Sequence, residues 1–189
     1  MAVKTMAASG AGKFNEGWHE LTISNAEYGI YKAPDGDKRY ISIHFDGYPD
    51  NMDLRIYEVK NKTTGEEFKI ANLFRYANAG IIGVLKDPTG KRPVIQYDDE
   101  AQNLVGKSVN VFFYKEQKTG NGYSRLFDSV APVAHEGEHL TFTDDQVTGI
   151  KAGVEKNWHR VHGTKTEGVG FGTTTTNTAT KTSDADLPF

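Results

Sequence analysis

The sequence contains no cysteine and no long apolar run. Without thiols the chain has neither a disulfide framework nor a thiolate zinc site, so its fold must depend on a hydrophobic core. No segment approaches the roughly 20 apolar residues that span a bilayer, and the first residues lack the basic-then-apolar pattern of a secretion signal. These absences predict a soluble intracellular protein that makes no membrane contact.

Apolar residues are also few, at 37%, although aromatic residues reach 11%. This combination indicates an aromatic-rich folded part diluted by a polar, unfolded part. The net charge of −3 is unevenly distributed: residues 1–134 hold 17 Lys+Arg and 17 Asp+Glu, and residues 135–189 hold 5 and 8. A neutral folded part still binds nucleic acid if its basic residues converge on one face, because phosphate affinity depends on local potential.

Strand patterns dominate the first two thirds of the chain. Segment 18–32 is rich in β-branched and aromatic residues and predicts a long strand that bends, with Gly29 inside it. Segments 38–46 and 52–60 alternate between apolar and polar residues, and a continuation of the third strand is expected at Phe68 and Ile70. Segments 104–116 and 123–130 flank the turn KTGNG and predict a hairpin.

Between the third and fourth strands, residues 72–85 carry apolar side chains at helical spacing behind Asn72, a possible cap. The resulting order is three strands, a helix and two strands. We therefore expect a mainly β fold, a five-stranded OB-fold Greek-key barrel with one helix between strands 3 and 4, in residues 14–134.

Outside this barrel the pattern changes. Residues 1–13 predict a flexible arm, and residues 135–162 an extension with an amphipathic helix over 143–159 that begins with a Thr143/Gln146 capping box. Its apolar stripe ends at Trp158, which is expected to be buried against something. Residues 163–183, rich in Thr and Gly, predict a flexible linker to the six residues 184–189.

The side chains that alternate with the core set of each strand are aromatic and basic. On the last hairpin, Val109, Val111 and Phe113 are assigned to the core. Aromatic rings stack on unpaired bases and cations attract phosphates, so the outward set predicts a surface that binds single-stranded nucleic acid. That set is Tyr40, His44, Arg55, Tyr57, Phe112, Tyr114, Tyr123, Arg125 and Phe127.

Two other interpretations of this set stay open. Outward tyrosines are ordinary strand formers, and the face they share is sometimes buried under a helix or a partner subunit. A register slip of one residue, easiest at Phe112 and Phe113, exchanges the two faces.

The last six residues, Asp184-Ala185-Asp186-Leu187-Pro188-Phe189, carry acidic and apolar side chains. This segment resembles the acidic tip of bacterial and phage single-stranded DNA-binding proteins, although Ala185 stands where many members have Asp. Physically, Asp184 and Asp186 steer the tip to a basic rim, while Leu187, Pro188 and Phe189 fit an apolar pocket.

The resemblance implies a non-catalytic, cofactor-free protein, fitting a phage-type member, that binds and protects single-stranded DNA during replication, recombination or repair. It implies that the tip recruits partner proteins such as a polymerase, helicase, primase, recombinase or nuclease, in the cytoplasm of a bacterial or infected host cell. A homo-oligomer is compatible with it. The alternative from another class is an OB-fold adaptor that binds proteins and not DNA.

Two motifs suggest enzymes. His135-Glu136-Gly137-Glu138-His139 matches the H-E-x-x-H pattern of zinc hydrolases, but that site needs a helix, and Gly137 lies at its centre. Gly10-Ala11-Gly12-Lys13 resembles the end of a phosphate-binding loop, but Phe14 replaces the Ser or Thr that binds magnesium. We expect no metal site from either motif.

Overall fold

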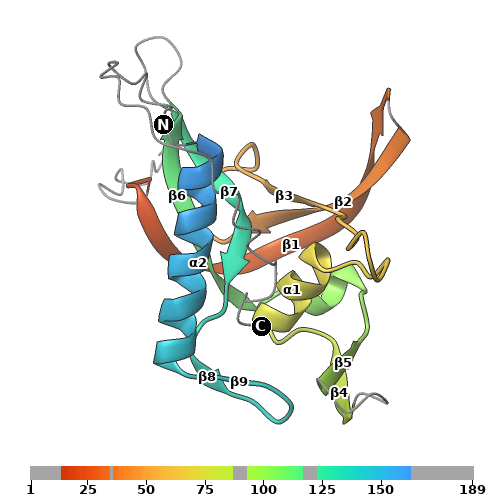
Figure 1. The fold of residues 1–189 in the computed structure, drawn as a ribbon. Coiled ribbons are helices and arrows are strands. Elements are labelled where there is room, and N and C mark those ends of the chain that lie inside the picture. Colours follow the sequence, from red (N-terminus) through yellow and green to blue (C-terminus); the bar gives the residue numbers. More distant parts are fainter. Residues whose placement is uncertain (1–13, 35, 87–92, 117–122, 163–189) are drawn as a thin grey trace, which may run out of the picture.

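The computed structural model describes residues 14–34, 36–86, 93–116 and 123–162, and within them the fold is mainly β with two α-helices (Figure 1). A five-stranded antiparallel sheet has the order β3-β2-β1-β6-β7. Its strands are β1 (Gly17–Ala33), β2 (Gly36–Phe45), β3 (Leu54–Tyr57), β6 (Ser108–Glu116) and β7 (Tyr123–Ala131). The five strands expected from the sequence are present, but two are shorter than predicted: the third is confined to Leu54–Tyr57, and the fourth begins at Ser108, after a short 3₁₀-helix (Ala101–Leu104), and not at residue 104.

β1 is the central strand and belongs to both halves of the sheet. Residues 17–22 pair with β6, and residues from Ile23 onward pair with β2. The register shifts between Ile23 and Asn25, which marks the bulge that lets the strand turn from one partner to the other. The predicted long strand is confirmed, but its irregularity lies at this bulge and not at Gly29.

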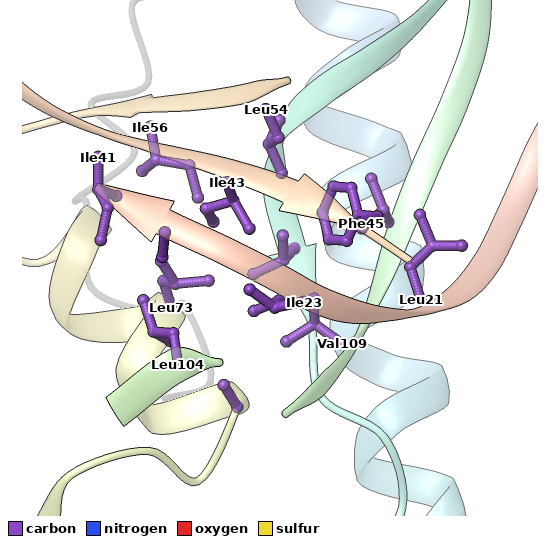
Figure 2. Packing of buried hydrophobic residues seen from close by; sticks show 14 of the residues in the cluster. Leu21, Ile23, Ile41, Ile43, Phe45, Leu54, Ile56, Leu73, Leu104 and Val109 are labelled. Carbon is purple, nitrogen blue, oxygen red and sulfur yellow. The ribbon is translucent and has the colours of Figure 1, made fainter. Parts of the chain in front are cut away.

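The core lies between the sheet and the helix α1 (Lys69–Tyr76) (Figure 2). Ile41, Ile43 and Phe45 of β2 are buried, as the alternation predicted, and so are Leu54 and Ile56 of β3. The predicted register of β6 also holds, because the core set of this strand is fully buried: Val109, Val111 and Phe113. The alternative of a slipped register is therefore excluded.

The helix α1 begins earlier than the sequence predicted. The carboxylate of Glu67 accepts hydrogen bonds from the backbone N–H of Lys69 (2.7 Å), Ile70 (2.8 Å) and Ala71 (2.9 Å), groups that have no partner inside the helix. Asn72 is therefore not the cap. The expected strand continuation at Phe68 and Ile70 is also wrong, because only Lys60 and Glu67 form an isolated bridge there.

The same helix ends at Tyr76, well before the predicted residue 85. Asn78 adopts a positive φ of 48°, and the backbone N–H of Ala79 bonds the carbonyl of Phe74 (2.9 Å), an arrangement that closes a helix C-terminus. The chain then forms the hairpin β4 (Ile81–Lys86) and β5 (Pro93–Tyr97), which the sequence interpretation missed. An apolar run such as 81–85 does not by periodicity alone separate a helix from a strand.

The second helix, α2 (Asp144–His162), confirms the expected capping box. The backbone N–H of Gln146 bonds the Thr143 hydroxyl (3.3 Å), and the Gln146 amide oxygen accepts from the Thr143 N–H (3.0 Å). Figure 1 shows α2 alongside β6 and β7. A short hairpin of β8 (His135–Glu136) and β9 (Thr141–Phe142) precedes it. Neither helix in the described ranges has the length and apolar character to cross a membrane.

Candidate nucleic-acid interface

Three tyrosines and one arginine gather on the side of β1, β2 and β3 that faces away from the core. Tyr40 and Tyr57 are directly paired across β2 and β3, with ring centroids 5.5 Å apart. Tyr31 of β1 contacts Tyr57 edge-on at 6.1 Å, and the Arg55 guanidinium lies 5.5 Å from the centre of the Tyr40 ring. We call Tyr31, Tyr40, Tyr57 and Arg55 the tyrosine face.

The tyrosine face is open. Tyr31 keeps 51% of its surface exposed, Arg55 keeps 54% of its side chain exposed, and Tyr40 and Tyr57 are half-buried. An aromatic ring that is held on one side and open on the other is a surface on which a base can stack. The arrangement therefore combines stacking surfaces with a cation that is always charged.

The Tyr40 ring packs directly on the backbone of Gly29. The two residues are paired across β1 and β2, and a Cβ atom at position 29 would lie 2.4 Å from Cζ and 2.5 Å from the hydroxyl of Tyr40. Only a residue without a side chain lets the ring lie down over the β1 backbone. Gly29 thus sets the orientation of this tyrosine, a role different from the bend that the sequence suggested.

Arg55 is held by its neighbours. Its Nε–H donates to the Asp53 carboxylate at 2.6 Å, and the Ser42 hydroxyl donates to the same oxygen at 2.7 Å. Burial by itself raises the pKa of the Asp53 carboxyl, but the hydrogen bonds from Ser42 and Arg55 outweigh burial and leave that pKa below its usual value. Asp53 therefore stays ionised at neutral pH and pairs with the arginine.

Three aromatic residues of the predicted set do not lie on this open surface. Rings of α2 cover the aromatic face of β6 and β7: Trp158 contacts Phe112 and Tyr114, each at 5.7 Å, and His162 contacts Phe127 at 5.9 Å. Phe127 keeps only 6% of its surface exposed. The prediction that these three aromatics are displayed outward is corrected, because the two-residue period identifies a face but not what packs on it.

A second set of contacts, made by Trp18, also holds α2 against the sheet. The Trp18 indole N–H donates to the Glu155 carboxylate of α2 at 2.6 Å, and the Trp18 ring packs on Phe112 at 5.4 Å. Trp158, which the sequence predicted to be buried, packs on the same Phe112 ring. The interpretation of the β6–β7 aromatics as helix-covered, left open by the sequence, is the one that the structure favours.

The remaining predicted residues are distributed as follows. Arg125 is exposed but donates to Glu116 at 3.0 Å; this pair joins β6 and β7, which are not strands of the tyrosine face. His44 is half-buried on β2, and its partner across β1 is Asn25. The side chain of Tyr123 and the residues of the tip lie outside the described part of the chain.

Tyr31 is the residue of this site that the sequence interpretation missed. Its membership follows from the β1–β2 register, in which Tyr31 pairs with Lys38 and Gly29 with Tyr40, so all four share one face. The signal was available, because Ala33 pairs with Gly36 and this pair fixes the register of the rest of the β1–β2 ladder. The bulge between Ile23 and Asn25 obscures this signal. If the alternation is counted from Trp18 without the bulge, Tyr31 is assigned to the wrong face of the strand.

The opposite face of the same strands is less suited to an anion. It contains a hollow of about 400 Å³ where Arg39 stacks on the Tyr28 ring at 3.8 Å and pairs with Asp99 at 3.3 Å. Acidic side chains line this hollow and its cation is already paired, which opposes phosphate binding. The hollow is lined by Tyr28, Gly29, Ile30, Asp37, Arg39 and Glu58.

The H-E-x-x-H segment does not form the helix that a zinc hydrolase needs. His135 and Glu136 are in strand β8, and Gly137 bonds back to Leu140 across a turn (3.0 Å). Within the four described ranges, no cluster of three or more His, Asp or Glu side chains is placed to hold a metal ion.

No protein-family model matches the chain, and no curated protein matches it.

Proposed function

We propose that this chain is a non-catalytic single-stranded DNA-binding protein built on an OB-type barrel. The barrel assignment is supported by the strand order β3-β2-β1-β6-β7, in which one long strand serves both halves, and by contact between the edge strands β3 and β7. Partly open five-stranded Greek-key barrels of this kind bind oligonucleotides on the face of their second and third strands. Tyr40, Arg55 and Tyr57 lie on the second and third strands here, and Tyr31 lies on the adjoining β1.

The observation that carries the proposal is the tyrosine face itself. Tyr31, Tyr40 and Tyr57 form contiguous rings on an exposed surface with Arg55 beside them. Bases in a duplex are stacked on one another, whereas unpaired bases are free to stack on protein rings at about 1–3 kcal/mol each. Such a surface prefers single strands, tolerates any sequence and loses affinity as salt rises.

The proposal is tested by fluorescence anisotropy with a labelled poly-dT oligonucleotide at two salt concentrations, with duplex DNA of equal length as competitor. We expect tight binding that weakens with salt and that the duplex does not displace. Absence of binding at low salt contradicts the proposal and favours the protein-binding adaptor. Poly-U in place of poly-dT reports the preference between DNA and RNA.

We also propose that the acidic tip, residues 184–189, recruits replication or repair proteins. The support is the resemblance of its residues together with their chemistry, two carboxylates followed by Leu-Pro-Phe. A chain cut after Thr182 is expected to keep its affinity for poly-dT or to bind more tightly, because the tip is acidic and competes with DNA for basic groups. A large loss of affinity on truncation contradicts separate roles for barrel and tip.

Gly29→Ala is expected to weaken poly-dT binding about five- to tenfold. The new methyl group occupies the position of the Tyr40 ring, so the ring must swing away and loses its stacking orientation, at a cost within the range of one stacked base. Affinity is measured by anisotropy and stability by thermal unfolding. The matched control is Gly83→Ala, a strand glycine with nothing within 4 Å of the added Cβ. Equal affinities of the two variants contradict the role given to Gly29.

A further inference from the structure

The tyrosine face contains a negative charge beside its cation. Asp53 lies next to β3, and its Oδ2 atom accepts from both the buried Ser42 hydroxyl and the Nε–H of Arg55. A carboxylate near a phosphate-binding surface repels the ligand, so charge alone predicts that Asp53 weakens DNA binding. Its hydrogen bonds indicate instead that Asp53 strengthens DNA binding.

The geometry of the Asp53–Arg55 pair explains how a carboxylate can strengthen the binding of an anion. An unrestrained arginine loses side-chain entropy when it binds a ligand, and this loss weakens binding. Asp53 occupies only the Nε–H of Arg55, which leaves the N–H groups of the terminal Nη atoms as donors for a phosphate. Ser42, in turn, fixes the carboxylate, because its own hydroxyl is on a buried position of β2.

The position of the guanidinium fits a backbone contact. It lies over the Tyr40 ring, 5.5 Å from its centre, so a nucleotide that docks on the tyrosine face approaches Arg55 closely. The orientation of Arg55 thus determines whether stacking and phosphate binding occur together.

We propose that Asp53 is a positioning residue of the DNA-binding face, which holds Arg55 in the orientation that receives a phosphate and so strengthens binding in spite of its own negative charge. This inference rests on the proposed function. It assigns no contact between Asp53 and DNA, because the carboxylate acts through Arg55.

The experiment compares Asp53→Ala with Glu27→Ala in the full chain. Glu27 is exposed on β1 directly opposite Ser42, so each substitution removes one carboxylate from the same surface. We expect Asp53→Ala to bind poly-dT about fivefold more weakly, and Glu27→Ala to bind equally or up to about twofold more tightly. Asp53→Asn retains a neutral acceptor for Ser42 and Arg55 and is expected to fall between wild type and Asp53→Ala.

A second background separates positioning from a general structural role. In an Arg55→Gln chain, Asp53→Ala is expected to cause no further loss, because the group through which Asp53 acts is absent. An equal loss in both backgrounds overturns the proposal, as does an Asp53→Ala chain that binds as tightly as wild type. If the wild-type chain does not bind poly-dT at all, it is the proposed function that fails.

Discussion

Replacing Tyr40 and Tyr57 together by alanine is expected to reduce affinity for poly-dT at least about 30-fold. The two rings form the centre of the tyrosine face, and each stacked base contributes about 1–3 kcal/mol, so the loss of both removes about 2–6 kcal/mol. Neither ring belongs to the buried core, and the fold is expected to persist. Anisotropy measures the affinity, and circular dichroism verifies the fold.

Two control variants make this result specific. The double Tyr→Phe variant keeps both rings and is expected to bind within about threefold of wild type, because stacking needs the ring and not the hydroxyl. Tyr114→Ala removes a tyrosine that lies against Trp158 and is expected to lower stability while leaving affinity intact. Equal affinities of the double alanine variant and wild type would place DNA elsewhere on the molecule.

Trp158→Ala is expected to lower the free energy of unfolding by about 2–3 kcal/mol without a comparable change in affinity for poly-dT. The Trp158 ring contacts Phe112, Tyr114 and His162, so its loss leaves a cavity between α2 and the sheet. Urea unfolding measures the change as a lower transition midpoint. Affinity should stay within about twofold, because the tyrosine face lies on the other strands.

The matched control for this helix is Val161→Ala, because Val161 is 60% exposed on α2 and a substitution there is expected to change stability by less than about 0.5 kcal/mol. An unchanged midpoint for Trp158→Ala argues against stable packing of α2 on β6 and β7. A tenfold or greater change in DNA affinity, in either direction, assigns the covered aromatics to the binding surface after all.

The sequence predicts those parts of the fold whose pattern is local and regular. Alternation identified the core set of β2 and β6, and the Thr143/Gln146 capping box identified the start of α2. The limits of α1 were missed because they depend on two features that periodicity does not report: the side chain of Glu67, which caps the first turn, and the left-handed Asn78, which ends the last. The β4–β5 hairpin was also missed, because the predicted helix was extended past its true end into β4.

Three of the four residues of the tyrosine face follow from the sequence. Tyr40, Arg55 and Tyr57 come together as predicted, because they lie on paired strands whose register is fixed by the core on the opposite face. Phe112 and Phe127 were assigned to the same surface, but α2 comes from a distant part of the chain, and no local pattern states where a helix packs. The hydrogen bond from Arg55 to Asp53 likewise depends on side-chain orientations that no local sequence pattern states.

The most direct test of the central claim is an amide NMR titration of the isotope-labelled chain with a short dT oligonucleotide. Binding at the tyrosine face predicts chemical-shift changes concentrated in residues 27–31, 38–44 and 53–57, with small changes in α2 and in the β4–β5 hairpin. Shifts concentrated in α2 and β6–β7 instead would contradict the assignment of the binding surface. An unchanged spectrum at saturating oligonucleotide and low salt would contradict DNA binding itself.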